Sequence, residues 1–283
     1  MQTLTTVAEV QAFSKRLARE GKTLALVPTM GFLHEGHQSL MREGAKRADV
    51  VAATIFVNPT QFGPNEDLSK YPRDLKGDLQ KCEAAGASVV FAPVPAEVYP
   101  EGFQTFVEVE RVSQGLCGTS RPGHFRGVAT VVTKLLAMFR PDLALFGEKD
   151  FQQLAVIRTL NADLNLGVNI IGMPTVREAD GLAMSSRNTY LSADERQRAL
   201  SISKSLREAQ AKVKAGERSV LALVEGIRAA LTQSALREDY VEIRDSLTLE
   251  PLQTLDATRE ARVLVAVFAG KTRLIDNMPL VSR

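Results

Sequence analysis

Two of the chain's three histidines, His34 and His37, lie three residues apart in one glycine-containing turn. The apolar run 24–27 before the turn predicts a fully buried strand, and residues 38–47 after it predict a helix. The turn therefore lies where a helix exposes unpaired N–H groups and the positive end of its dipole. Such a corner favours an anion, and a phosphate is the best candidate.

Three other interpretations of the two histidines are weaker. If they were ordinary surface or core residues, nothing would explain why two of only three share one turn. A metal pair would lack the His-Glu-x-x-His spacing, and both cysteines are remote in sequence. Gly31 and Gly36 have the glycine spacing of a P-loop, but His37 and Gln38 stand where its lysine and hydroxyl residue must be. A phosphate-binding histidine turn remains the best account.

The longer string around the turn, Pro28-Thr-Met-Gly-Phe-Leu-His-Glu-Gly-His37, adds a resemblance. Its His-x-Gly-His pattern resembles that of nucleotidyltransferases and class I aminoacyl-tRNA synthetases, which form adenylates from ATP. The whole string is similar to one family in particular, the pantoate–β-alanine ligases. Motifs further along the chain test this resemblance.

Composition narrows the class of protein. With 283 residues and 45% hydrophobic content the chain can bury a substantial core, and its net charge of +2 gives no reason to expect a nucleic-acid partner. Two cysteines, Cys82 and Cys117, are too few for a disulfide framework and fit a reducing compartment. The first 19 residues contain no apolar signal-peptide core, and no run approaches the roughly 20 apolar residues of a membrane helix. We therefore expect a cytoplasmic protein that binds neither membrane nor nucleic acid.

The loop 58–63 follows a second apolar run, 49–57, which predicts a strand and completes a βαβ unit. Ligands of open α/β sheets bind outside the carboxyl ends of the strands, so Gln61 is placed to meet one. Its amide both donates and accepts, which suits a hydroxyl and a carboxylate together. The string Asn-Pro-Thr-Gln-Phe is similar to the family's pantoate-binding loop, which implies that Gln61 binds pantoate.

Three further segments are expected before the middle of the chain. A helix is expected over 74–85, and its Asp78 could reach a metal-bound phosphate. Family members often carry an acidic residue where this chain has Gly77, which puts a magnesium role for Asp78 in doubt. Strands are expected at 88–92 and, as a short alternating strand, at 106–109.

The loop 121–128 contains the third histidine and two arginines before a strongly periodic helix. Basic residues at a helix start oppose the dipole, at a cost of a few tenths to about 1 kcal/mol, and a bound anion would offset that cost. A loop with incidental charge stays open as the alternative. The string resembles the family's, which favours a wall of the active site.

The run 142–146 predicts another buried strand, followed by Gly147-Glu-Lys-Asp150 and a helix. This layout repeats that of the histidine turn, and Lys149 supplies the phosphate-directed cation that the turn lacks. Gln153, one turn into the helix, can point at the same ligand as Gln61. The string Phe-Gly-Glu-Lys-Asp-Phe-Gln-Gln again resembles the pantoate–β-alanine ligases.

A last strand of the sheet is expected at 168–172, and then a flexible loop, 181–188, offers Ser185, Ser186 and Arg187 to triphosphate oxygens. This loop is similar to the mobile Lys-Met-Ser-Lys-Ser loop of the synthetase superfamily. It lacks the lysines, so Arg187 and Lys149 must share the charge.

The order of the expected helices and strands changes beyond residue 190. A capping-box pattern at Ser192 and Glu195 begins a long helix to about residue 214, a second helix is expected over 219–233, and strands at 240–244 and 261–268 precede a short tail. Helices followed by strands suggest a small α+β domain. We expect an α/β fold with two domains: a Rossmann-like parallel sheet over 1–176 that binds ATP and pantoate, and a smaller α+β domain over 177–283 that carries the Ser-Ser-Arg loop and covers the active site.

The resemblance covers nearly the whole chain and implies ATP-dependent ligation of (R)-pantoate to β-alanine through a pantoyl adenylate, with release of pyrophosphate and AMP. It also implies a homodimer and Mg²⁺ that bridges phosphates with few or no protein ligands. The expected catalytic residues are His34, His37 and Lys149, and Gln61 and Gln153 are expected to bind the small substrates. The expected ATP-binding residues are Met30, Gly31, Phe32, Leu33, His34, Glu35, Gly36, His37, Gly147, Glu148, Lys149, Asp150, Val176, Met184, Ser185, Ser186 and Arg187.

Two rival functions stay open at this point. A sister nucleotidyltransferase acting on a phosphorylated cofactor precursor would share the histidine turn but would not need the paired glutamines. A non-catalytic regulator would bind ATP without releasing pyrophosphate.

Overall fold

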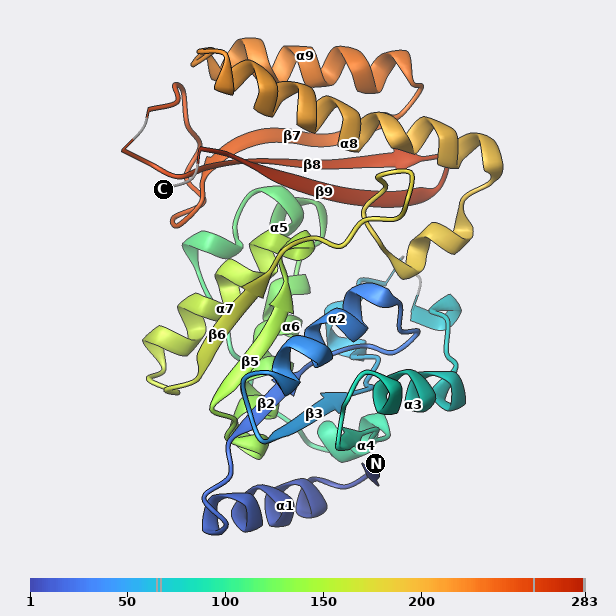
Figure 1. The fold of residues 1–283 in the computed structure, drawn as a ribbon, viewed down its shortest axis with the longest axis vertical. Helices are drawn as coiled ribbons and strands as arrows, with labels where there is room; N and C mark the ends of the chain where they lie inside the picture. The colour runs from blue at the N-terminus through green and yellow to red at the C-terminus, as the bar shows by residue number, and fades with distance from the viewer. Residues whose placement is uncertain (65, 67, 257, 282–283) are drawn as a thin grey trace. The chain divides into compact units, whose positions relative to one another are not determined.

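The computed structural model describes residues 1–64, 66, 68–256 and 258–281. It divides into two compact units, one made of Met1–Glu148 with Val156–Pro174 and the other of Lys149–Ala155 with Thr175–Arg283 (Figure 1). The first contains a parallel sheet with helices and the second a small antiparallel sheet, so the predicted α/β fold class is confirmed. Within the described residues, no helix has the length and apolar character needed to cross a bilayer.

The sheet of the first unit has the strand order β1-β4-β3-β2-β5-β6, and all neighbouring strands are parallel. The chain runs from β2 to β3 on one side and later adds β5 on the other side of β2. The carboxyl ends of β2 and β5 therefore form the topological switch point, where ligands of such sheets bind. The strands are β1 (Gln2–Leu4), β2 (Leu24–Val27), β3 (Val50–Thr54), β4 (Val89–Phe91), β5 (Leu143–Gly147) and β6 (Asn169–Met173).

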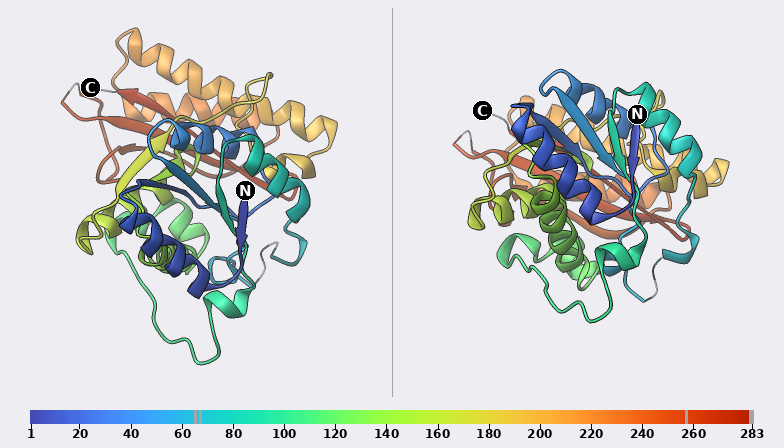
Figure 2. Two further views of the ribbon diagram at one scale, coloured as in Figure 1. Left: turned by 60° about the horizontal axis from the view of Figure 1, so that its bottom comes forward. Right: turned by 90° about the horizontal axis from the view of Figure 1, so that it is seen from below.

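Helices cover both faces of this sheet, as Figure 2 shows in the view from below. Alternate strand residues such as Ala25 and Val27 join one buried cluster with residues of α2 and α3, as the two-residue period of a strand requires. On the other face α1 contacts α6, where the Ser14 hydroxyl donates to the Met138 carbonyl at 3.2 Å. The helices are α1 (Val7–Arg19), α2 (Glu35–Ala45), α3 (Leu75–Ala84), α4 (Pro95–Val98), α5 (Leu116–Ser120), α6 (His124–Phe139) and α7 (Phe151–Asp163), which begins in the second unit.

Three details of the first unit differ from the sequence-based expectation. Helix α2 begins at Glu35 rather than at residue 38, because His34 caps it and the next three residues are already helical. The strand expected at 106–109 is wrong, since those described residues form no strand. Strand β1 was not expected, because its three residues are too few to show a period and they pair with β4 far along the chain.

The second unit packs two helices on an antiparallel sheet of order β7-β8-β9. The predicted capping box is confirmed: the Ser192 hydroxyl accepts from the Glu195 N–H at 3.2 Å, and the Glu195 carboxylate accepts from the Ser192 N–H at 2.8 Å. The expected short tail is instead a full strand that pairs with β8, and its mixed sequence with Asp276, Asn277 and Pro279 hid it. The elements are α8 (Ala193–Lys214), α9 (Val220–Gln233), β7 (Arg237–Asp245), β8 (Ala261–Ala269) and β9 (Thr272–Val281).

Candidate active site

The histidine turn connects the carboxyl end of β2 to the first turn of α2. The Nδ1 atom of His34 accepts from the Gly36 N–H at 3.2 Å, and Nδ1 of His37 accepts from the His34 N–H at 3.3 Å. The two rings are 4.1 Å apart between centroids. Because each Nδ1 accepts a hydrogen bond, each neutral ring carries its hydrogen on Nε2. The helix start thus presents two imidazole N–H donors of fixed tautomer, which suits an anion.

A buried carboxylate of α3 accepts hydrogen bonds from the backbone of the histidine turn. Asp78 is 1% exposed, and its two oxygens accept from the N–H groups of Phe32 and Leu33, both at 2.7 Å. Phe32 adopts a left-handed conformation with φ of 49°, which costs a non-glycine residue roughly 1–2 kcal/mol. Lys81, one turn further along α3, donates to the Leu33 carbonyl at 2.8 Å. The sequence left Asp78 without a defined role, and the structure makes it the acceptor that fixes the turn.

Gln61 lies in the short 3₁₀ helix η1 (Pro59–Gln61) that follows β3, and it is 8% exposed. Its side-chain oxygen accepts from the Asn58 amide at 3.1 Å, and its side-chain nitrogen contacts the sulfur of Met30 at 3.0 Å. Met30 belongs to the histidine turn. The first unit therefore brings the predicted substrate glutamine directly against the predicted nucleotide-binding turn.

Asn58 organises this loop and was not singled out from the sequence. It is 1% exposed, its amide also donates to the Gly127 carbonyl at 3.1 Å, and its oxygen accepts from the Tyr99 hydroxyl at 2.9 Å. Burial raises the pKa of Tyr99 above its ordinary value, although hydrogen bonds to Thr60 and Asn58 work in the opposite direction. Tyr99 therefore stays a neutral donor to Asn58 at neutral pH.

The loop 121–128 also contacts Gln61. His124 is 8% exposed, its Nδ1 lies 2.9 Å from the Gln61 carbonyl oxygen, and its Nε2 lies 2.9 Å from Nη1 of Arg121. Both oxygens of Glu66 pair with Arg121 at 2.7 Å. Burial tends to raise the pKa of Glu66, but the hydrogen bonds and positive charge of Arg121 outweigh it, so the pKa is lowered. The anion expected to offset the charge of this loop is thus a carboxylate of the protein itself.

At the switch point, Gly147 ends β5 and Glu148 begins the 3₁₀ helix η4 (Glu148–Asp150). Lys149 and Asp150 belong to the second unit, where the Lys149 ammonium lies 3.7 Å from the Asp150 carboxylate. Gln153 lies half-buried in the first turn of α7. Because Gln61 and Gln153 belong to different units, their convergence on one ligand stays a prediction.

The remaining predicted ATP-binding residues form one structured loop in the second unit. The Met184 N–H donates to the Val176 carbonyl at 3.0 Å, so these two residues lie side by side. The Ser185 hydroxyl accepts from the Arg187 N–H at 3.3 Å and caps the 3₁₀ helix η5 (Ser186–Tyr190). This cap fixes the backbone of the Ser-Ser-Arg segment.

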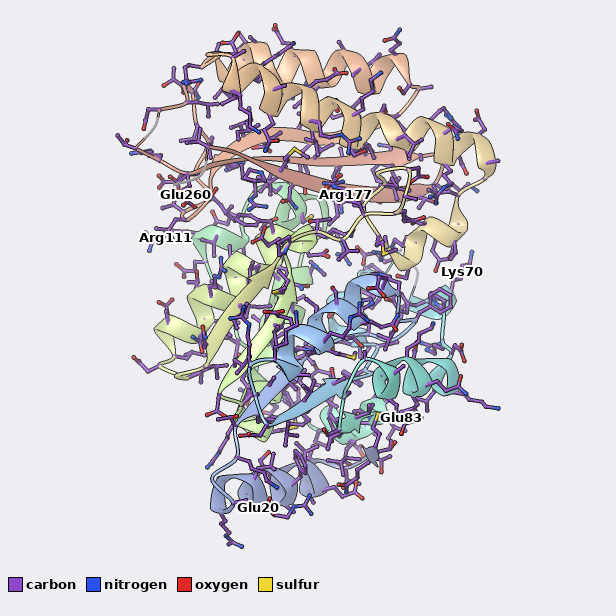
Figure 3. The ribbon with its side chains drawn as sticks, viewed as in Figure 1. Glu20, Lys70, Glu83, Arg111, Arg177 and Glu260 are labelled. Atoms are coloured by element: carbon purple, nitrogen blue, oxygen red, sulfur yellow. The ribbon has the colours of Figure 1, made fainter. Side chains whose placement is uncertain are left out.

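A network of partly exposed charged side chains supports the loop. The Asn188 amide donates to Glu178 at 2.6 Å, and Arg196 of α8 donates to both Glu178 and Asp180 at 2.6 Å. Arg177, labelled in Figure 3, makes a two-pronged pair with Asp276 of β9 at 2.6 and 2.9 Å. The sequence singled out only the loop 181–188. The pairing of Arg177 with Asp276 was not expected, because the two residues lie 99 positions apart.

The described residues contain no group of three His, Cys, Asp or Glu side chains placed to hold a metal ion. Asp78, which binds the backbone of the turn, uses both oxygens on N–H groups. Cys82 and Cys117 are both buried, and neither is in a disulfide. Burial and the neighbouring charge of Asp78 raise the pKa of Cys82 to about 12, so its thiol is inert.

A parallel sheet, a switch point flanked by a histidine-capped helix, and a lysine following the adjacent strand define a nucleotide-binding α/β enzyme. Residues 2–279 match the family model described as pantoate-beta-alanine ligase. The chain belongs to the pantoate–β-alanine ligase family and is a ligase.

Curated relatives and solved structures match this chain over nearly its full length. The chain is 65% identical to the pantothenate synthetase of Myxococcus xanthus, over 98% of this chain and 95% of that protein, and 56% identical to that of Geobacter sulfurreducens, over 99% of each. The Thermus thermophilus pantothenate synthetase structure superposes with a TM-score of 0.94 at 43% identity over all of both chains. The Francisella tularensis ligase, solved in complex with beta-gamma ATP and β-alanine, gives 0.82 at 33% identity over 99% of this chain and 98% of that one.

Proposed function

We propose that this ligase, which joins pantoate to β-alanine, does so in two steps through a pantoyl adenylate. In the first step a pantoate carboxylate oxygen bonds to the α-phosphorus of ATP, and pyrophosphate leaves. In the second the β-alanine amine attacks the acyl carbon, the carbon–oxygen bond breaks, and AMP leaves with that oxygen. No protein nucleophile is required, so catalysis rests on positioning and charge stabilisation.

The observation that carries this proposal is the pair of imidazoles capping α2 at the switch point. Their Nε2–H groups are suited to phosphate oxygens that gain charge as pyrophosphate departs. We assign proton donation to His37, which lies in the first turn of the helix, and electrostatic binding to His34, the cap residue.

The triphosphate is assigned to the cations and hydroxyls of the second unit: Lys149, Ser185, Ser186 and Arg187. The capped backbone of η5 supports this role, because its donors need no reorganisation before binding. The nucleotide is assigned to the remaining predicted residues, which are Met30, Gly31, Phe32, Leu33, Glu35, Gly36, Gly147, Glu148, Asp150, Val176 and Met184.

Pantoate and β-alanine are assigned to Gln61 and Gln153. The burial of Gln61 against the histidine turn supports this assignment, since a buried amide discriminates strongly for ligands that satisfy its hydrogen bonds. The Francisella complex with beta-gamma ATP and β-alanine supports two of the three substrates.

Mg²⁺ is proposed to arrive bound to the phosphates of ATP, where it neutralises charge on the leaving pyrophosphate. Both oxygens of Asp78 already accept from backbone N–H groups, which supports Mg²⁺ coordination mainly by phosphate oxygens. We also propose a cytoplasmic homodimer: two cysteines outside any disulfide fit a reducing compartment, and the family resemblance supports the dimer. The boundary near residue 176 between catalytic and smaller domains is likewise proposed.

Oxygen tracing tests the two-step route. With pantoate labelled by ¹⁸O in both carboxylate positions, each turnover should place one ¹⁸O in AMP and leave one in the new amide, as mass spectrometry of both products will show. A label in inorganic phosphate would indicate an acyl phosphate, and unlabelled AMP would rule out the adenylate.

A further inference from the structure

The loop 121–128 has no part in the proposed chemistry, yet it makes the closest buried polar contacts with the backbone of Gln61. Helix α6 reaches that backbone because Gly127 lies in its first turn. A Cβ atom at position 127 would come within 2.3 Å of the Thr60 carbonyl oxygen and 2.7 Å of the Gln61 Cα atom. Only a glycine allows α6 and η1 to pack backbone against backbone, which brings His124 within reach of the Gln61 carbonyl.

The protonation pattern of His124 follows from its two partners. A carbonyl oxygen only accepts, so Nδ1 of His124 carries a hydrogen and donates it to Gln61 at 2.9 Å. A guanidinium only donates, so Nε2 accepts from Arg121, also at 2.9 Å. His124 is therefore neutral with its hydrogen on Nδ1, the opposite tautomer to that of His34 and His37.

Arg121 is itself fixed in place. Its Nε and Nη2 atoms donate to the two oxygens of Glu66 at 2.7 Å, a planar two-pronged pair that restricts the guanidinium in both position and orientation. Its Nη2 also lies 3.4 Å from the Gln61 carbonyl oxygen. A continuous relay of hydrogen bonds thus runs from Glu66 through Arg121 and His124 to the backbone of Gln61.

The side chain of Gln61 is held separately by Asn58 and Met30. A backbone shift at Gln61 would move its amide relative to both partners, because the residue ends a 3₁₀ helix of only three residues. We propose that Arg121 and His124 are positioning residues that lock the backbone of Gln61 and so set the affinity of this enzyme for its carboxylic acid substrate. The proposal rests on the assignment of pantoate to Gln61.

Two substitutions at one position separate this role from simple packing. In His124→Asn the side-chain nitrogen takes the place of Nδ1 and can still donate to Gln61, whereas in His124→Gln the amide takes the place of Nε2 and reaches Arg121 only. Steady-state kinetics should show a pantoate KM raised about five- to tenfold in His124→Gln, the usual worth of one hydrogen bond, and within about twofold of wild type in His124→Asn. The KM for ATP should stay within about twofold in both.

A third variant, at another position, keeps the test valid if the histidine variants fold poorly. Arg121→Met keeps the aliphatic stem on a side chain that is 15% exposed, removes the donor to Nε2, and should also raise the pantoate KM with little change in that for ATP. Equal pantoate KM values in the two histidine variants, or a wild-type value in Arg121→Met, would overturn the proposal.

The variant Gln61→Ala distinguishes two possible failures: that of the positioning role, and that of the assignment of pantoate to Gln61. If Gln61→Ala raises the pantoate KM at least tenfold while His124→Gln leaves it unchanged, Gln61 binds pantoate without help from the relay. If Gln61→Ala leaves the pantoate KM unchanged in an active enzyme, the assignment of Gln61 is wrong and the positioning role falls with it.

Discussion

Replacing His37 by alanine is expected to lower the rate of adenylate formation by about 10²–10⁴-fold, the usual reach of one acid–base or electrostatic group. His37 lies in the first turn of α2, and its Nδ1 accepts from the His34 N–H, which directs the Nε2 hydrogen away from the helix backbone. The substitution removes the donor that we assign to the departing phosphate. Rapid quench of enzyme with ATP, Mg²⁺ and pantoate, without β-alanine, measures this step directly.

The alanine variant also removes a helix-cap contact, so a second variant separates the two effects. In His37→Asn the side-chain oxygen can accept from the His34 N–H as Nδ1 does, but no donor replaces Nε2. We expect His37→Asn to melt like wild type and to lose as much adenylation rate as His37→Ala. Lys46→Ala, at the C-cap of the same helix and with a side chain 72% exposed, serves as the control and should retain full activity. Recovery of the wild-type rate in His37→Asn would show that His37 acts as a cap only.

Asp78→Asn is expected to lower both stability and activity. The carboxylate accepts from one buried and one partly buried backbone N–H group, and an asparagine can accept from only one of them while its NH₂ group faces the other donor. Loss of one charge-assisted bond and an unsatisfied buried donor together cost about 2–4 kcal/mol. The melting temperature should fall by roughly 5–10 °C. Because the same bonds fix Phe32 and Leu33, we also expect kcat to fall at least about tenfold, as precise placement of the adjoining histidines is lost.

Asp74→Asn provides a matched control for that variant. Asp74 caps the same helix, its side chain accepts from the Gly77 N–H at 3.0 Å, and the residue is exposed. Asparagine caps a helix about as well as aspartate, so stability and kcat should stay near wild type. Calorimetry and steady-state assays of both variants give the comparison. Equal melting temperatures for Asp78→Asn and wild type would show that the turn holds its conformation without this carboxylate.

The parts of the site that the sequence predicts are those encoded locally. The histidine turn follows from an apolar run, two glycines and a helix start within 20 residues, and the structure confirms strand β2 and helix α2 around it. The start of α2 was misplaced because histidine is an unusual cap residue, and the usual cap types did not mark the boundary. Local signals thus predict an element but leave its end uncertain.

The residues that the sequence did not assign act across long separations. Asp78 bonds to Phe32 from 46 positions away, and Asn58 bonds to Tyr99 from 41 and to Gly127 from 69. Nothing in the spacing of these residues indicates that α3 packs behind the turn or that α6 meets η1. Such contacts exist only once the sheet has assembled, so single-sequence patterns cannot predict them.

Isotope exchange between ATP and labelled pyrophosphate, with Mg²⁺ and pantoate present and β-alanine absent, tests the central claim most directly. Reversible formation of a pantoyl adenylate predicts exchange that requires pantoate and that falls in His37→Ala in proportion to its adenylation rate. Exchange without pantoate, or pantothenate synthesis at a normal rate with no exchange under any condition, would contradict the adenylate mechanism.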